Sequence, residues 1–277
     1  MGQHHPIMLR TLGLLFALAL ASCGTAPPPA TVQTGAIPVP QGETPIVTRP
    51  NFGDADPASF GSNGPNQHPI HGIDVARFQQ SVDWREARAN GVNFAFIKAT
   101  EGGDLVDPLF RDHWRGAGRA GIPRGAYHFF NHCRPAAEQA AFFIRNVPRT
   151  RGALPPVLDM EWTPFSPTCT IRRAPEVIRS EAKIFLDIVQ AHYGQRPIIY
   201  STVDFYRENE MWRVGPYPFW LRSVAAHPDE IYGGRHWSFW QYTSTGLIPG
   251  ITGKVDINVF DGSIAQWGAW LAANRHP

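Results

Sequence analysis

The sequence contains few cysteines, little charge and no long apolar segment. Of 277 residues only three are Cys, and Lys plus Arg number 25 against 23 for Asp plus Glu. A net charge of +2 gives no reason to expect a nucleic-acid partner, which requires a clearly basic surface. The H-E-x-x-H, G-x-S-x-G and phosphate-loop patterns are absent, so nothing supports a metalloprotease, a serine hydrolase or a nucleotide-binding enzyme. We expect neither a metal nor a cofactor.

The apolar stretch near the start, Leu12 to Ala21, is shorter than the roughly 20 residues that cross a bilayer. It follows Arg10 and ends in Leu-Ala-Ser-Cys at Cys23, which predicts an export signal over residues 1–23. Those four residues resemble a bacterial lipobox, whose Cys carries lipid; an ordinary cleaved signal is the alternative. An Asp directly after the lipid-carrying Cys is associated with inner-membrane retention, and this chain has Gly24 at that position. We therefore expect an exported lipoprotein, membrane-anchored at the periplasmic face of the outer membrane.

The rest of the chain divides into a linker and one domain. Residues 24–69 are rich in proline and lack a periodic apolar pattern, which predicts a flexible linker. Residues 70–277 are numerous enough for one barrel, and 43% of the whole sequence is hydrophobic, with nine Trp. We expect this domain to be a monomer.

Short apolar runs alternate with helical patterns over the first part of this domain, which indicates a parallel sheet. The later runs are separated by segments rich in Gly and Pro, which leave no room for covering helices. The pattern predicts an α/β fold: a single irregular (β/α) barrel of eight strands, with helices covering mainly the first five. The expected strands are 71–75, 94–99, 125–130, 156–161, 197–201, 219–224, 238–243 and 256–260, and the expected helices are 82–89, 108–120, 135–147, 175–193 and 263–274.

If Cys23 carries lipid, Cys133 and Cys169 remain, and such a pair in an oxidising compartment is usually bonded. The two residues follow the third and fourth expected strands, whose loops emerge at the same end of a parallel barrel. We predict a Cys133–Cys169 disulfide at that rim. A nucleophile formed by His132 and Cys133 is the alternative, which is disfavoured because adjacent residues rarely face each other.

The segment PPVLDMEW, Pro155 to Trp162, is the most informative in the chain. In an extended strand, side chains two residues apart point the same way, with Cα atoms roughly 6.5 Å apart. Asp159 and Glu161 therefore share one face at the end of an apolar strand. Two carboxyls this close cannot both ionise cheaply, so one should stay protonated near neutral pH. A proton donor beside a carboxylate predicts glycosidic bond hydrolysis; a solvated pair of acids is the alternative.

Polar and aromatic residues occur at seven of the eight expected strands, near the ends where active residues of such barrels gather. Singly, each has an ordinary structural explanation: Lys98 with Glu101 is a plausible ion pair, and Trp240 is a plausible core residue. Together they favour a site. The set comprises Asp74, Lys98, Glu101, Tyr127, His128, Asp159, Glu161, Tyr200, Gln241, Tyr242, Asp256 and Asn258.

Several segments in register resemble the family 25 glycoside hydrolases, lysozymes that act as N-acetylmuramidases on bacterial cell walls. They include HGIDVARFQQSVDW, NFAFIKATEGGDLVDPLF, AGIPRGAYHFF, PPVLDMEW, RPIIYS and WSFWQYTSTGLIPGITGKVDINVF, and they extend over nearly all of residues 70–261. The resemblance implies cleavage of the β-1,4 bond between N-acetylmuramic acid and N-acetylglucosamine in peptidoglycan glycan strands. It also implies retention of configuration with assistance from the substrate's acetamido group, or direct attack by a carboxylate.

The resemblance assigns roles by position. Glu161 matches the general acid/base and Asp159 its partner carboxylate, while Asp74 and Asp256 match two further acids around the pocket. By the resemblance, Tyr127, Tyr200, Trp240 and Gln241 lie at substrate-lining positions. Lys98 and Glu101, from the strand-end pattern, are also expected to contact substrate. The sequence departs from the family at FWLRSV, where Arg222 and Val224 replace a small residue and commonly a Tyr.

Two other functions fit parts of the sequence. A peptidoglycan-binding barrel without activity would keep the fold, but all four acids are present. A chitinase-like hydrolase commonly has further Asp residues at two-residue steps before D-x-E, where this chain has Val157 and Pro155.

Overall fold

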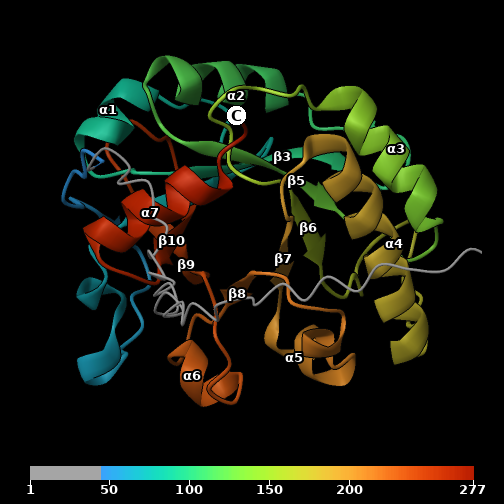
Figure 1. Cartoon of the computed structure of the whole chain (residues 1–277). Coiled ribbons are helices and arrows are strands. Elements are labelled where there is room, and N and C mark those ends of the chain that lie inside the picture. Colours follow the sequence, from blue (N-terminus) through green and yellow to red (C-terminus); the bar gives the residue numbers. More distant parts are fainter. Residues whose placement is uncertain (1–44) are drawn as a thin grey trace, which may run out of the picture. The chain divides into compact units, whose positions relative to one another are not determined.

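The computed structural model describes residues 45–277, and its centre is a closed barrel of eight strands. Neighbouring strands from β2 to β9 run parallel, while β10 runs antiparallel between β9 and β2 and closes the ring (Figure 1). The predicted barrel is confirmed. Its strands are β2 (His71–Val75), β3 (Ala95–Glu101), β5 (Arg124–Phe129), β6 (Val157–Met160), β7 (Ile198–Ser201), β8 (Phe219–Arg222), β9 (Phe239–Leu247) and β10 (Val255–Phe260).

Helices lie outside the barrel, and apart from the last helix of the chain the longer ones follow its first strands, as predicted (Figure 1). Two short helices after β7 and β8 and a two-residue strand, β4 (Leu105–Val106), paired with β3, were not predicted. Among the described residues no helix is both long and apolar enough to cross a membrane. The helices are α1 (Trp84–Ala89), α2 (Phe110–Arg119), α3 (Ala136–Asn146), α4 (Pro175–Tyr193), α5 (Val203–Glu208), α6 (Pro228–Ile231) and α7 (Ile264–Asn274).

Helix α4 shows how the sequence encodes these elements. Pro175 occupies its first turn, where a missing N–H costs nothing, and Gly194 ends it in the left-handed conformation at φ 69°. Its buried residues recur at helical spacing and pack between the barrel and α3. They are Ile178, Ala182, Phe185, Leu186, Val189 and Tyr193.

The barrel interior is apolar at one end and polar at the other. Trp267 of α7 packs against Phe94, with ring centroids 5.6 Å apart, and against Phe260 at 4.9 Å, so α7 closes the apolar end. Two residues after Phe94, in β3, the ring of Phe96 stacks on that of Trp220, with the ring centroids 4.6 Å apart. The carboxyl ends of the parallel strands therefore remain as the open end, where a site can form.

The predicted linker over residues 24–69 is wrong for its second half; residues 24–44 lie outside the described part. Residues 45–69 contain β1 (Gly53–Asp54), which pairs with β9, and two 3₁₀ helices, η1 (Gly61–Asn63) and η2 (Pro65–Gln67). The ring of Phe60 packs edge-on against Trp240 at 5.0 Å. A proline-rich segment packs here because its aromatic residues cover apolar surface outside the barrel.

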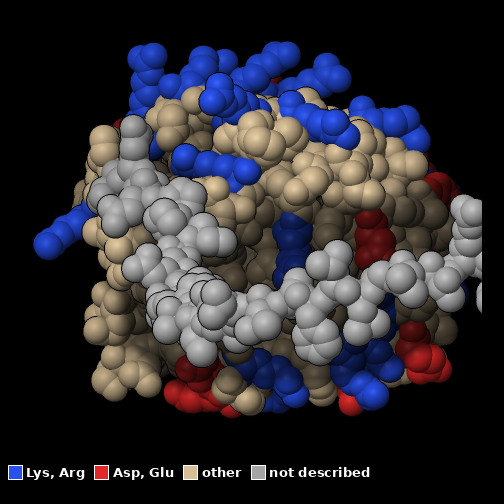
Figure 2. All heavy atoms as spheres, viewed as in Figure 1, with Lys and Arg blue, Asp and Glu red and all other residues tan. Residues whose placement is uncertain are grey.

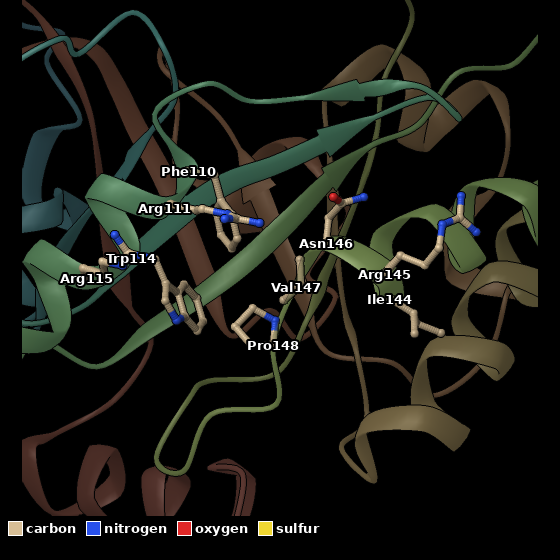
Figure 3. A pocket seen from close by; sticks show the side chains of 9 residues that line it. All are labelled: Phe110, Arg111, Trp114, Arg115, Ile144, Arg145, Asn146, Val147 and Pro148. Carbon is tan, nitrogen blue, oxygen red and sulfur yellow. The ribbon is translucent and has the colours of Figure 1, made fainter.

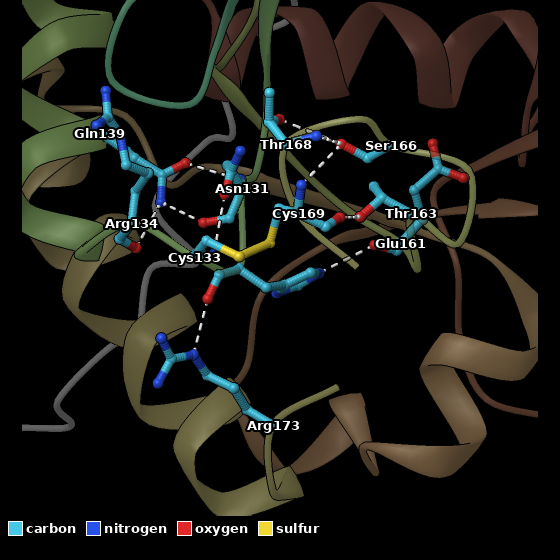
Figure 4. The surroundings of a disulfide bond; sticks show 11 residues. Asn131, Cys133, Arg134, Gln139, Glu161, Thr163, Ser166, Thr168, Cys169 and Arg173 are labelled. Carbon is cyan, nitrogen blue, oxygen red and sulfur yellow. Dashed lines mark hydrogen bonds between the residues drawn. A yellow bond between two sulfur atoms is a disulfide. The ribbon is translucent and has the colours of Figure 1, made fainter. Parts of the chain in front are cut away.

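The predicted Cys133–Cys169 disulfide is present, with the two Cα atoms 5.8 Å apart (Figure 4). It joins the loop between β5 and α3 to the loop between β6 and α4. Both loops follow parallel strands, so the bond braces the open end of the barrel.

Removing this bond should destabilise the domain. The cysteines are 36 residues apart, and closing a loop of that length stabilises a fold by about 3–4 kcal/mol through the unfolded state. We expect the double variant Cys133→Ala/Cys169→Ala to lose that free energy of unfolding in urea titrations. Cys23→Ser, which leaves the bond intact, is the matched control. A double variant as stable as this control would contradict the prediction.

Candidate active site

A cavity of about 320 Å³ opens at the carboxyl ends of the strands and contains all four predicted acids. Strands β2, β6 and β10 supply Asp74, Asp159 and Asp256, and Glu161 directly follows β6. The remaining lining is mostly polar and aromatic. It consists of Val75, Ala76, Phe78, Gln79, Lys98, Tyr127, Phe129, Tyr200, Trp220, Arg222, Gln241 and Ser244.

Asp74 is held by a chain of buried hydrogen bonds. Its Oδ2 atom accepts from Gln241 Nε2 at 2.9 Å and from Asn258 Nδ2 at 2.8 Å. Tyr200 donates its hydroxyl proton to Gln241 Oε1 at 2.9 Å, and Trp220 Nε1 donates to Asn258 Oδ1 at 2.7 Å. Burial raises the pKa of Asp74 to about 6, although both amide donors favour its charged form. The network fixes this carboxyl in one orientation.

Burial also raises the pKa of the other three acids. It raises that of Asp159 well above its usual range, and the nearby charge of Glu161 adds to the effect. Burial raises the pKa of Glu161 to about 7, against the opposing pull of Arg222 and Lys98. For Asp256, burial and the charge of Asp74 raise the pKa to about 8. Near neutral pH the cluster therefore holds protons, so a carboxylic acid can donate beside a carboxylate.

The backbone of Glu161 is anchored to the disulfide-braced rim. His132 Nε2 donates to the carbonyl oxygen of Glu161 at 3.0 Å, and Arg173 Nε donates to the carbonyl oxygen of His132 at 2.7 Å (Figure 4). The imidazole stacks on Phe205 at 5.3 Å, and burial lowers its pKa, so it is neutral. Because Cys133 is bonded to Cys169, the alternative of a His132–Cys133 nucleophile is wrong.

Four of the six predicted substrate-contacting residues line the cavity: Tyr127, Tyr200, Gln241 and Lys98. Their contact with substrate stays a prediction. Glu101 lies outside the lining and instead accepts a hydrogen bond from Lys98 Nζ at 2.7 Å, so it positions that amine.

The predicted place of Trp240 in the pocket is wrong. This residue is fully buried outside the barrel, where its Nε1 donates to the carbonyl oxygen of Ser223 at 2.7 Å. Neighbouring residues on a strand face opposite sides, so Gln241 points inward and Trp240 outward.

The predicted site set omitted Trp220 and Arg222, which lie two residues apart on β8 and both line the cavity. Trp220 forms an aromatic wall, with its ring 4.5 Å from that of Tyr200. The period-two alternation of FWLR is the signal that places both side chains on one face.

A second cavity, of about 380 Å³, lies between α2 and α3 (Figure 3). It is lined by Phe110, Trp114 and three arginines, Arg111, Arg115 and Arg145, together with Ile144 and residues 146–148. Figure 2 shows Lys and Arg gathered along the edge of the molecule formed by these helices. Within the described part of the chain no carboxyl group lines this cavity, whereas four line the cavity at the barrel end, so acid–base hydrolysis is assigned to the barrel end. Nor do residues 45–277 contain a cluster of His, Cys, Asp and Glu suited to a metal ion.

Comparison with known proteins points to one family. The family described as Glycosyl hydrolases family 25 matches residues 73–251. Lysozyme M1 of Streptomyces globisporus is 34% identical over 212 residues, which cover 71% of this chain and 69% of that protein. The uncharacterized protein YegX of Escherichia coli (strain K12) is 37% identical over 219 residues, 77% of each chain.

Solved structures agree. A family 25 glycosyl hydrolase from Bacillus anthracis gives a TM-score of 0.67 at 32% identity, over 78% of this chain and 98% of that one. The lysozyme of Streptomyces coelicolor gives a TM-score of 0.64 at 32% identity, over 73% and 96% of the two chains. The barrel, its acidic end and these similarities lead to one conclusion: this chain belongs to family 25 of the glycosyl hydrolases.

Proposed function

We propose that this lysozyme-type hydrolase cleaves the β-1,4 bond between N-acetylmuramic acid and N-acetylglucosamine in peptidoglycan, with Glu161 as proton donor. The observation that carries the assignment is the cavity at the carboxyl end of the barrel, where Glu161 and Asp159 lie together with raised pKa values. Relatives named lysozyme and N,O-diacetylmuramidase support the same bond and the same substrate.

The first step breaks the glycosidic bond. Protonated Glu161 donates to the oxygen that leaves with N-acetylglucosamine, because an alcohol leaves more readily than an alkoxide. The acetamido oxygen of the muramic acid attacks its own C1 from the opposite face and forms a cyclic oxazolinium ion. Asp159 holds the acetamido N–H; its Oδ1 atom has no hydrogen-bond partner in residues 45–277 and remains available for that contact.

The second step opens this ring. Glu161, now a carboxylate, removes a proton from water, which attacks C1 from the face that the leaving group vacated. Two inversions at C1 retain its configuration. Asp74 and Asp256 border the same cavity. The pKa of Asp74, about 6, leaves it mostly ionised near neutral pH, so it contributes negative charge as positive charge develops at C1, while Asp256 with its pKa of about 8 stays mostly protonated beside it.

Digestion of purified peptidoglycan tests this assignment. We expect fragments that end in reducing N-acetylmuramic acid by mass spectrometry, with the β anomer appearing first by proton NMR. The Glu161→Gln variant should release these fragments at least about 100-fold more slowly, because an amide keeps the shape but donates no catalytic proton.

Several outcomes would contradict the assignment. Unchanged turnover by folded Glu161→Gln would remove Glu161 from its role. A first-formed α anomer would exclude retention, and a trapped sugar ester on Asp159 would replace acetamido assistance with direct attack. Absence of new reducing ends would indicate a binding barrel, and faster cleavage of chitin than of peptidoglycan would indicate a chitinase-like enzyme.

We further propose that Cys23, which lies outside the described residues, carries lipid and anchors the enzyme to the outer membrane facing the periplasm. The support is the sequence Leu-Ala-Ser-Cys followed by Gly24. A lipid-modified N-terminus with several acyl chains anchors stably, whereas one chain binds only marginally.

Replacing this cysteine should detach the protein. We expect Cys23→Ser to move from the membrane to the soluble fraction without losing activity on soluble glycan fragments, since residue 23 precedes the barrel. Fractionation in high salt, which strips peripheral proteins, is the measurement. Equal membrane retention of Cys23→Ser and the wild-type protein would rule the anchor out.

A further inference from the structure

Arg222 is a cation within the acidic cavity. It ends β8 in register with Gln241 of β9, on the same face as Trp220, and its side chain lines the cavity. Its carbonyl oxygen accepts a hydrogen bond from the Tyr232 hydroxyl at 2.6 Å, which fixes the backbone at this position. The guanidinium is therefore attached to a rigid strand end beside the four acids.

The guanidinium of Arg222 has no partner in the described part of the chain. Neither a hydrogen bond nor an ion pair links its side chain to another residue between 45 and 277. Lys98, the other cation of the lining, is already paired with Glu101 at 2.7 Å. The planar fork of an arginine matches a carboxylate with two parallel hydrogen bonds. Arg222 thus offers a half-buried anion site that residues 45–277 leave open.

The proposed reaction determines which sugar lies nearest. The bond that breaks joins C1 of N-acetylmuramic acid to its neighbour, so that sugar must occupy the cavity with the acids. Its lactyl group, on O3, distinguishes it from N-acetylglucosamine and ends in a carboxyl. In peptide-bearing strands this carboxyl forms an amide with the stem peptide and has no charge. Once the peptide has been removed, it is the only anion on an N-acetylated glycan backbone.

We propose that Arg222 binds the free lactyl carboxylate of N-acetylmuramic acid, so that the enzyme prefers glycan strands stripped of peptide. This inference rests on the proposed function and adds to it a substrate class. It also gives the enzyme a place in a sequence of reactions: a hydrolase that cuts the amide between lactyl group and peptide must act first.

A purely electrostatic role for Arg222 makes a different prediction. As a counter-charge to the acids, the guanidinium affects the cluster in the same way whatever the substrate carries. If the guanidinium instead binds the lactyl carboxylate, it raises the rate of cleavage only when the lactyl group is charged. The two roles therefore separate in a cycle of enzyme variants against substrate variants.

The experiment uses three soluble glycans of equal length: peptide-free, peptide-bearing, and peptide-free with the lactyl carboxyl converted to a primary amide. The amide nearly matches the acid in size but has no charge. The kcat/KM values of the wild type, Arg222→Gln and Arg222→Lys are compared on each glycan. Arg145→Gln is the matched control, because it makes the same substitution at an exposed arginine beside the second cavity.

We expect the wild type and Arg145→Gln to cleave the free acid roughly 10- to 100-fold faster than its amide, the range typical of a charge-assisted hydrogen bond. Arg222→Gln should lose this preference, and Arg222→Lys should keep part of it, because an ammonium lacks the fork. A merely structural role would lower all rates together and leave the ratio unchanged.

Two results would overturn the inference. One is wild-type cleavage of the free acid and its amide at equal rates, and the other is an unchanged ratio in Arg222→Gln. Failure of the wild type to cleave any of the three glycans would instead contradict the proposed function, so the two failures are distinguishable.

Discussion

The burial of four carboxyl groups at one end of the barrel is the constraint on which the rest of the structure depends. A charged carboxyl loses hydration when it is buried, and its neighbours' charges add repulsion, so protons stay bound at higher pH than in water. The pKa of Glu161 rises to about 7 for this reason. A closed barrel makes such burial possible, because apolar layers and α7 fill its other end.

The reversed last strand contributes directly to the site. Asp256 lies near the start of β10, and only an antiparallel strand brings that end to the carboxyl ends of its neighbours. The same strand provides Asn258, whose amide holds Asp74. Across the barrel, the Cys133–Cys169 bond and His132 hold the backbone of Glu161. The acids are thus fixed from two sides by unrelated parts of the chain.

Much of this arrangement follows from local patterns in the sequence. Alternation along PPVLDMEW placed Asp159 and Glu161 on one face, and the order of strands and helices predicted the barrel. Other features depend on contacts that no local pattern encodes. The family resemblance assigns Trp240 to the pocket, and the sequence alone does not show which of the neighbouring residues Trp240 and Gln241 faces inward. The composition of residues 45–69 predicts a linker. Their pairing with β9 could not be predicted, because β9 lies almost 200 residues later in the sequence. That the guanidinium of Arg222 has no hydrogen-bond partner within residues 45–277 is visible only once the side chains around it are placed.

The most direct test of the account is the titration of Glu161 itself. Carbon-13 NMR of protein labelled at the glutamate side-chain carboxyls reports each group separately. The account predicts one carboxyl that titrates near pH 7 and whose signal is missing from Glu161→Gln. If every glutamate instead titrates near its ordinary pKa of about 4.3, burial does not hold the catalytic proton and the account is contradicted.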